Sequence, residues 1–215
     1  MPPVIQRLES TPSTQDVLHE QAASGAPAGT AVVASAQTGG RGSRGRGWES
    51  PAGGLWLSVL LRPTVEPALE VLSVRVALAV AGAIEKATAS QVAIALKWPN
   101  DLILAGRKLG GILCEARWQG GALGWVVVGI GVNVRNPIPV SLADSAIALS
   151  SVLDGVGPER LIEPLVTAVA AIGDRQGHLG TEEAADFAAR DWLRGRRLRE
   201  PGMGTAEGVS PDGAL

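Results

Sequence analysis

A glycine- and arginine-rich segment constrains the fold of this 215-residue chain more than any other feature. Residues 37–48, QTGGRGSRGRGW, lie between two apolar runs, residues 30–36 and 55–61, whose length and composition are typical of buried strands. Glycine leaves backbone N–H groups free to turn toward an anion, and arginine offers a planar, charged fork for carboxylate or phosphate. The segment therefore predicts a mobile, cationic flap that closes over a small anionic ligand.

Three other interpretations of this flap compete. Its glycines fit the GxGxxG pattern of a dinucleotide-binding turn, but that pattern requires a helix to open there, and Gly47, Pro51 and Gly53 disfavour one. An RGG-type nucleic-acid segment is expected in a polar low-complexity tail rather than between two apolar runs. A solvated, charged turn without function is the third alternative. The flanking strands favour the anion-binding flap.

The composition limits the class of protein in which such a flap works. Hydrophobic residues make up 46% of the chain and charged residues 19%, which indicates a globular protein. The net charge is −2, so the basic character is local, and a general nucleic-acid or membrane-surface protein is disfavoured. The single cysteine, Cys114, excludes an internal disulfide and favours a reducing compartment. Because the sequence has no signal-peptide or membrane-spanning pattern, we expect a cytoplasmic protein without a membrane partner.

Residues 92–115 form the second informative stretch, expected to be a strand followed by a hairpin that turns at residues 105–106. Three polar residues gather at the end of that strand: Lys97, Asn100 and Asp101. Polar groups at a strand end can meet a ligand, although an ordinary turn is the simpler interpretation. Gly110 and Gly111 leave backbone without side chains inside the hairpin, which is a common sign of close ligand approach.

The remaining elements frame these two stretches. Gly129 and Gly131 lie two apart in a buried strand, so both leave the same face flat enough for a planar ligand, and Asn133 continues that face. Residues 1–8 are expected to be a short lead-in. Periodicity and capping residues predict helices beginning after Ser13 or Thr14 and at residues 69–84, 141–153, 158–172 and 181–193.

Three motifs, in this order and spacing, resemble the biotin protein ligase family: GGRGSRGRGW, KWPNDLILAGRKLGGILCE and VVVGIGVNV. The likeness covers residues 13–192, the family's catalytic domain. It implies an α/β fold with a mixed β-sheet and helices packed on one side, shared with lipoate ligases and octanoyl transferases. We expect residues 1–194 to form this domain and residues 195–215 to begin a small C-terminal β module that is truncated. Because few residues precede Ser13, the resemblance implies neither a DNA-binding domain nor a DNA partner.

The resemblance also implies roles for individual residues. The residues expected around biotin are Ser13, Thr14, Gln15, Gln37, Gly40, Arg41, Gly42, Ser43, Lys108, Gly111, Ile112 and Leu113. The residues expected to face ATP or the adenylate are Arg44, Arg46, Trp48, Lys97, Asn100, Asp101 and Asn133. Lys108 and Arg41 are expected to be catalytic, and Asp101 is expected to hold Mg²⁺.

The implied reaction joins biotin to ATP and then transfers biotin from biotinyl-5′-adenylate to a lysine of a biotin carboxyl carrier domain. A lipoate or octanoate enzyme of the same fold and a non-catalytic biotin-binding relic remain alternatives, and a homodimer is left open. Two positions depart from the family pattern. Ser43 stands where the common GRGRRGR loop has an arginine, so one cation is missing, and Gln15 stands where an asparagine is usual.

Overall fold

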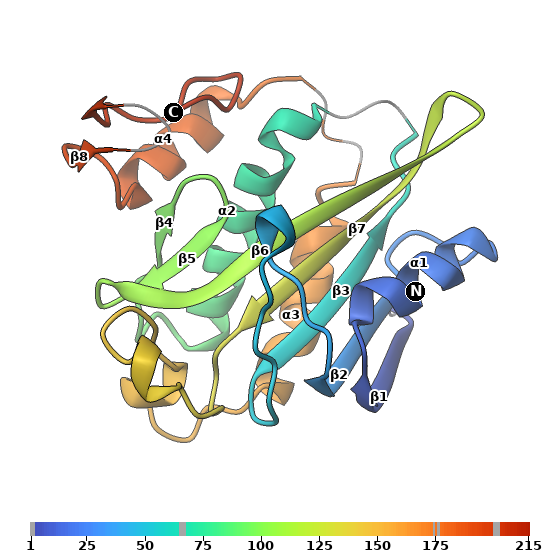
Figure 1. The fold of residues 1–215 in the computed structure, drawn as a ribbon. Helices are drawn as coiled ribbons and strands as arrows, with labels where there is room; N and C mark the ends of the chain where they lie inside the picture. Colours follow the sequence, from blue (N-terminus) through green and yellow to red (C-terminus); the bar gives the residue numbers. More distant parts are fainter. Residues whose placement is uncertain (1–2, 65–67, 174, 176, 200–202) are drawn as a thin grey trace.

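A seven-stranded mixed sheet is the centre of the computed structural model, which describes residues 3–64, 68–173, 175, 177–199 and 203–215 (Figure 1). The strand order is β1-β2-β3-β7-β6-β5-β4. Its strands are β1 (Ile5–Thr11), β2 (Ala31–Gln37), β3 (Leu55–Leu61), β4 (Ala95–Lys97), β5 (Asp101–Leu104), β6 (Arg107–Gln119) and β7 (Ala122–Val132). The β1–β2 pair is parallel and every other neighbouring pair is antiparallel. The expected mixed α/β fold is confirmed.

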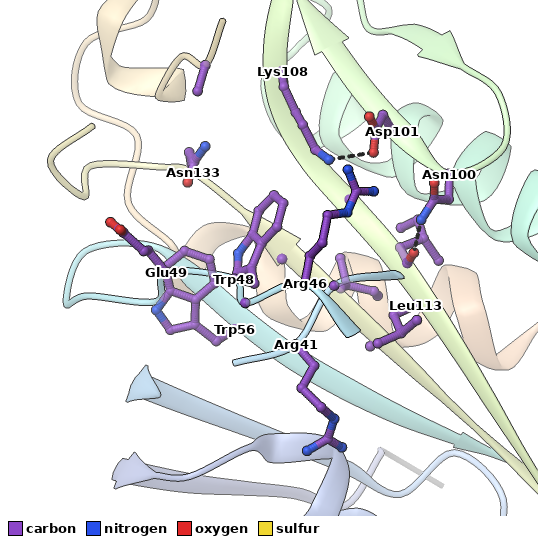
Figure 2. A pocket seen from close by; sticks show the side chains of 18 of the residues that line it. Arg41, Arg46, Trp48, Glu49, Trp56, Asn100, Asp101, Lys108, Leu113 and Asn133 are labelled. Carbon is purple, nitrogen blue, oxygen red and sulfur yellow. Dashed lines mark hydrogen bonds and ion pairs between the residues drawn. The ribbon is translucent and has the colours of Figure 1, made fainter. Parts of the chain in front are cut away.

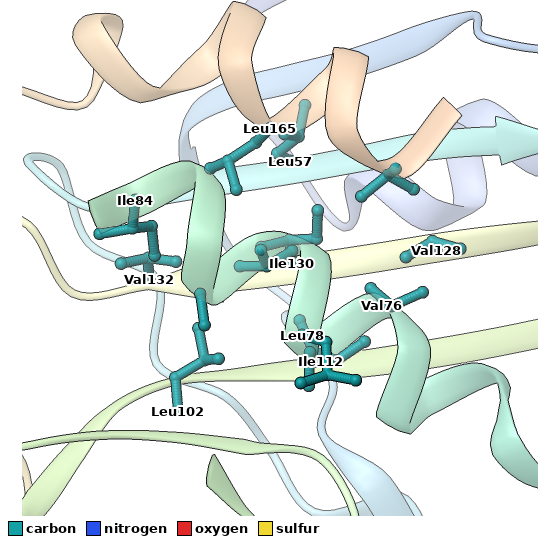
Figure 3. Packing of buried hydrophobic residues seen from close by; sticks show 14 of the residues in the cluster. Leu57, Val76, Leu78, Ile84, Leu102, Ile112, Val128, Ile130, Val132 and Leu165 are labelled. Carbon is teal, nitrogen blue, oxygen red and sulfur yellow. The ribbon is translucent and has the colours of Figure 1, made fainter. Parts of the chain in front are cut away.

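The helices cover the two faces of the sheet unequally. They are α1 (Thr14–Ala23), α2 (Leu69–Ala87), α3 (Glu159–Ala170) and α4 (Thr181–Arg190). Figure 3 shows α2 and α3 packing on side chains from β3, β6 and β7, including Leu57, Ile112 and Ile130. The first helix is the exception to the expected one-sided packing, because its Leu18 joins a separate cluster with Val127 on the opposite face.

That opposite face is only partly covered by α1. Side chains alternate along β7, so Val128, Ile130 and Val132 enter the main core while Val127 meets α1. Gly129 and Gly131 continue the α1 face beyond Val127, and they bring no side chain of their own. The sheet therefore presents a shallow, open floor immediately beside the N-terminus of α1.

Two segments differ from the sequence-based expectation. The expected lead-in contains β1, because its backbone pairs in parallel with β2 even though its side chains are mostly exposed. Residues 141–153 form no α-helix; they hold only two 3₁₀ turns, Val140–Leu142 and Leu149–Ser151. Short local turns are combined here with hydrogen bonds to neighbouring strands, since Lys108 N–H donates to the Ser145 carbonyl at 2.8 Å and Leu149 N–H to the Asn133 carbonyl at 2.9 Å.

The C-terminal residues return to the main domain. A two-stranded antiparallel ribbon joins β8 (Arg197–Leu198) to β9 (Gly204–Thr205), and residues 200–202 of the expected β module lie outside the described residues. Beyond the ribbon, the Trp98 indole N–H donates to the Gly213 carbonyl at 2.8 Å. Among the described residues, no helix is long and apolar enough to cross a membrane.

Candidate functional site

A cavity of about 710 Å³ opens on the glycine face of the sheet. Figure 2 shows its lining side chains converging from the flap, from the β5–β6 hairpin and from the end of β7. The N-terminus of α1 and residues 136–146 complete the wall. The cavity thus gathers the three motifs that lie far apart in the sequence.

The floor of the cavity is built from glycine and from one indole. A Cβ atom at Gly131 would lie 2.8 Å from Trp48 Nε1, so only glycine lets the ring lie directly on β7. Gly111 faces the same space, with Trp48 and the Lys108 side chain each 3.7 Å from the position of its missing Cβ. Trp48 Nε1 is buried without a hydrogen-bond partner among the described residues, which leaves a donor for a ligand acceptor.

One end of the cavity is a buried polar cluster at the start of α1. Ser13 caps the helix by accepting from the Gln15 N–H at 3.3 Å. The backbone N–H and the hydroxyl of Thr14 both donate to Gln37 Oε1, at 2.9 and 3.1 Å. Gln15 Nε2 donates to the Leu113 carbonyl at 3.3 Å and so ties the helix to β6. These fixed donors and acceptors suit a small uncharged polar head group.

The other end is formed by the β5–β6 hairpin. Lys108 Nζ lies 2.6 Å from Asp101 Oδ1 and 5.0 Å from the centre of the Trp48 ring. Asn100 Nδ2 donates to the Ile112 carbonyl at 2.6 Å, which closes the start of the hairpin. Residues 105–106 turn with φ of +48° and +76°, as the expected two-residue turn requires. The turn carries Lys108 back beside Asp101.

Lys97 and Asn133 border the same end of the cavity. Lys97 Nζ lies 5.4 Å from the centre of the Trp192 ring, an indole that also lines the cavity. Asn133 is nearly buried, and its Oδ1 accepts from Asn136 Nδ2 at 3.0 Å. This contact leaves its amide N–H₂ as the group available for a ligand.

The flap arginines lie in three different directions. In Figure 2 the Arg46 side chain points toward Lys108 and Asp101, whereas Arg41 points the opposite way. Arg41 instead forms a two-pronged ion pair with Asp16, at 2.7 and 2.8 Å. Arg44 occupies the tip of the flap with φ of +60° and does not line the cavity. Gly40 is also outside the lining, because it lies beneath the Trp48 carbonyl and the Ser50 hydroxyl.

The other expected biotin and nucleotide residues do line the cavity. They are Ser13, Thr14, Gln15, Gln37, Arg41, Gly42, Ser43, Arg46, Trp48, Lys97, Asn100, Asp101, Lys108, Gly111, Ile112, Leu113 and Asn133. The lining residues outside the sequence expectation include Glu49 and Trp56 beside the flap, Asn136, several residues of the loop 137–146, and Trp192. The prolines at 137 and 139 indicated a loop there. No local sequence signal indicated that Trp192 would bond to β4, where its backbone N–H donates to the Leu96 carbonyl at 2.9 Å.

A magnesium site of protein ligands alone has little support in this cavity. The described residues contain no cluster of three or more histidine, cysteine or acidic side chains that could hold a metal ion. Asp101 offers one carboxylate, already paired with Lys108. That donor set fits Mg²⁺ carried mainly by substrate phosphates, because Mg²⁺ in nucleotide sites often takes only one or two protein carboxylates.

The sequence and the fold both match known proteins. The model of the Biotin/lipoate A/B protein ligase family matches residues 7–133. The bifunctional ligase/repressor BirA of Bacillus subtilis is 43% identical over 146 residues, which are 64% of this chain and 43% of that protein. The chain thus spans less than half the length of that relative. The biotin--[acetyl-CoA-carboxylase] ligase of Paracoccus denitrificans is 35% identical over 199 residues, covering 86% of this chain and 82% of the relative.

A solved structure extends the likeness to the fold. The biotin protein ligase from Aquifex aeolicus, in complex with biotin and ATP, superposes with a TM-score of 0.81 at 29% sequence identity. The superposition covers 98% of this chain and 89% of the Aquifex chain. It therefore includes the sheet, the flap and the hairpin that form the cavity.

Proposed function

The chain belongs to the biotin/lipoate A/B protein ligase family, and we propose that it is an ATP-dependent biotin ligase. In the proposed reaction the biotin carboxylate attacks the α-phosphate of ATP, which gives biotinyl-5′-adenylate and releases pyrophosphate. A lysine amine of a biotin carboxyl carrier domain then attacks the carbonyl carbon of this mixed anhydride, forming an amide and releasing AMP. The named ligase from Paracoccus and the biotin- and ATP-bound neighbour from Aquifex support this choice.

The position of Lys108 is the observation that carries the proposal. Its ammonium lies over Trp48 and beside Asp101, at the hairpin end of the cavity. Adenylation must bring two anions together, so fixed cations contribute more than an acid–base pair. Lys108 can donate to a carboxylate and to a phosphate oxygen at once, and Arg46 points to the same place (Figure 2).

The remaining residues orient the two substrates and exclude water. Ser13, Thr14 and Gln37 would hold the uncharged head of biotin, and Asn133 would bind an edge of the adenine base. Asp101 would hold the magnesium ion that ATP carries, which would neutralise phosphate charge. Because the mixed anhydride is hydrolysable, closure of the flap would keep water out until the carrier docks.

The acid that is activated distinguishes this proposal from its closest alternative. We expect ATP–pyrophosphate exchange with biotin and none above background with lipoate or octanoate. Exchange with lipoate or octanoate alone would identify the lipoate branch of the family. No exchange with any acid, together with retained biotin binding, would identify a binding relic.

The flap is expected to order when ligands bind. Its tip, residues 44–47, is exposed, and it carries two of the three flap arginines. We predict that trypsin cuts the free protein after Arg44 and Arg46, and that biotin with ATP slows this cleavage by at least about tenfold. The measurement is mass spectrometry of fragments over time. Equal cleavage rates with and without ligands would mean that the flap does not close.

The serine at position 43 is expected to weaken retention of the adenylate. Its Oγ accepts a 3.1 Å hydrogen bond from Arg46 Nη2, so it supports one cation rather than supplying another. A neutral hydrogen bond contributes about 0.5–1.5 kcal/mol, and a hydrogen bond to a charged group contributes about 1.5–3 kcal/mol. From the difference between these two contributions, we predict that Ser43→Arg slows escape of biotinyl-adenylate roughly five- to thirtyfold. Stray biotinylation of bystander lysines should fall in parallel.

The control for this prediction is Ser150→Arg, which adds the same charge at an exposed position outside the cavity lining. Release rates are measured by trapping free biotinyl-adenylate after rapid filtration. If Ser43→Arg and wild type release it at the same rate, backbone contacts rather than side-chain charge hold the intermediate.

The partners and the location are also part of the proposal. The carrier domain of a carboxylase is the expected acceptor, by analogy with the named Paracoccus ligase. A cytoplasmic location and the absence of a DNA partner are kept as predictions. The division into residues 1–194 and a small β module is kept as a prediction, and a homodimer is kept as an alternative to a monomer.

A further inference from the structure

Arg41 lines the cavity, but two carboxylates hold its side chain, which points away from Lys108 and Asp101 (Figure 2). Arg41 Nη1 and Nη2 donate to the two oxygens of Asp16 at 2.8 and 2.7 Å, and Nη2 also donates to Glu115 Oε2 at 3.4 Å. The hydrogen bonds from Arg41 hold the pKa of Asp16 below its usual value. An arginine engaged by two carboxylates has little positive charge to offer a third.

A further chain of hydrogen bonds holds Glu115. The Trp125 indole N–H donates to His19 Nδ1 at 2.9 Å, and His19 Nε2 lies 3.3 Å from Glu115 Oε2. Because an indole can only donate, His19 Nδ1 is an acceptor, and a neutral ring then carries its proton on Nε2 and donates to Glu115. Burial keeps the pKa of His19 below its usual value, which favours this neutral form. Glu115 is therefore a fixed acceptor for Arg41.

The partners of Arg41 belong to elements that border the polar end of the cavity. Asp16 lies in the first turn of α1, two residues after Thr14, and Glu115 lies two residues after Leu113 in β6. On the flap itself, Arg41 pairs with Gly47 in an antiparallel bridge, and Trp48 N–H donates to the Gly40 carbonyl at 2.9 Å. Arg41 thus connects the base of the flap to the two elements that carry Thr14 and Leu113.

We propose that Arg41 is a positioning residue that anchors the base of the flap to Asp16 and Glu115, rather than a direct ligand of the biotin carboxylate. This inference rests on the proposed function and deepens it. The anchor holds residues 40–42 beside the N-terminus of α1, so the flap backbone is in place when biotin enters. The expected catalytic role of the Arg41 side chain is replaced by this one, and Lys108 with Arg46 supplies the charge.

The two roles predict opposite behaviour for Asp16, which does not itself line the cavity. If Arg41 anchors the flap through Asp16, then Asp16→Asn and Arg41→Gln each raise the KM for biotin by about tenfold, which is the effect expected from losing one charge-assisted hydrogen bond. The kcat of each variant is expected to stay within about twofold of wild type. The double variant is then no worse than Arg41→Gln alone, because that single change already removes the contact with Asp16. The exchange of charges, Asp16→Arg with Arg41→Asp, recovers part of the loss.

The kinetic assay also identifies the competing roles. A near-native Asp16→Asn beside a strongly impaired Arg41→Gln would overturn the proposal, because Arg41 would then contact the ligand directly. A lower KM in Asp16→Asn would also overturn it, since Asp16 would then restrain Arg41 from binding. The matched control is Glu159→Gln, which removes another exposed arginine–carboxylate pair, Arg7 to Glu159 at 2.6 Å, away from the cavity.

A second readout separates this inference from the proposed function. Trypsin cleavage after Arg44 and Arg46 in the ligand-free protein is expected to be about tenfold faster in Asp16→Asn and Arg41→Gln than in wild type or Glu159→Gln. This readout requires no activity, so it tests the anchor even if wild type forms no biotinyl-adenylate. Unchanged cleavage in both variants would overturn the anchor and leave the proposed function standing.

Discussion

Lys108→Ala is expected to lose biotinyl-adenylate formation by roughly two to three orders of magnitude, the scale for removing one preorganised charge contact. Lys108 is placed by the hairpin turn, by the ion pair with Asp101 and by the face of Trp48. Its loss leaves the carboxylate and the phosphate without a shared cation, while the half-exposed pair with Asp101 adds little to folding. The measurement is the initial rate of ATP–pyrophosphate exchange at saturating biotin and ATP.

Lys108→Arg separates charge from geometry in the same experiment. A guanidinium keeps the charge but replaces a compact ammonium by a planar fork, so we expect it to restore little activity. The control is Lys86→Ala, which removes an exposed lysine from α2, far from the cavity lining. Near-native exchange in Lys108→Ala would mean that Lys108 is structural and that another cation joins the substrates.

Arg75→Met is expected to lower the free energy of unfolding by about 3–5 kcal/mol, because it breaks a buried ion pair and leaves the Glu183 carboxylate with only Arg175 and the Gly180 N–H as partners among the described residues. The Arg75 side chain is 4% exposed; it donates to Glu183 at 3.0–3.2 Å and to the His178 carbonyl at 2.6 Å. These contacts join α2 to α4. For a chain of this length the expected fall in Tm is about 6–20 °C, measured by calorimetry.

Arg175→Met is the matched control, since Arg175 also pairs with Glu183, at 2.9 Å, but is 60% exposed. Its loss is expected to cost less than about 1 kcal/mol. Replacing both partners, Arg75→Met with Glu183→Leu, should recover most of the stability. If Arg75→Met and Arg175→Met lowered the free energy of unfolding equally, burial of the Arg75–Glu183 pair would not be the source of its stabilising effect.

The same pair predicts a pH dependence of stability. Burial would raise the pKa of Glu183, but hydrogen bonds from Arg75, the Gly180 N–H and Arg175 outweigh it and lower the pKa. A carboxyl whose pKa is lower in the folded state stabilises the fold above its unfolded pKa of about 4.3, and this contribution is lost as the pH falls below that value. The variant Arg75→Met is expected to lose less stability between pH 5 and pH 3 than wild type, because Arg75 contributes to the lowered pKa of Glu183.

The parts of the fold that the sequence predicted are those with strong local signals. The flap between β2 and β3, the β5–β6 hairpin and the glycine face of β7 all depend on glycine spacing and apolar runs, and the structure contains each of them. Most of the expected ligand residues converge on one cavity because the three motifs end at the same region of the sheet.

The parts that the sequence did not predict depend on contacts between distant residues. The strand β1 has no apolar run and is formed by pairing with β2. Residues 141–153 form short turns that also bond to Lys108 and Asn133, instead of one continuous helix. The direction of Arg41 is set by Asp16 and Glu115, which are 25 and 74 residues away in the sequence. A motif indicates that an arginine is present, but only the packing of α1 and β6 decides which way it points.

The central claim, that this cavity joins biotin to ATP, is tested most directly by a single-turnover experiment. Purified protein, in excess over labelled biotin, is mixed with ATP and Mg²⁺. The reaction is quenched at successive times and biotinyl-5′-adenylate is separated and counted, and the Lys108→Ala variant is measured in parallel. We expect nearly all of the labelled biotin to become adenylate in wild type, dependent on ATP, and formation at least about a hundredfold slower in Lys108→Ala. Wild-type protein that binds biotin and ATP but forms no biotinyl-adenylate would contradict the account.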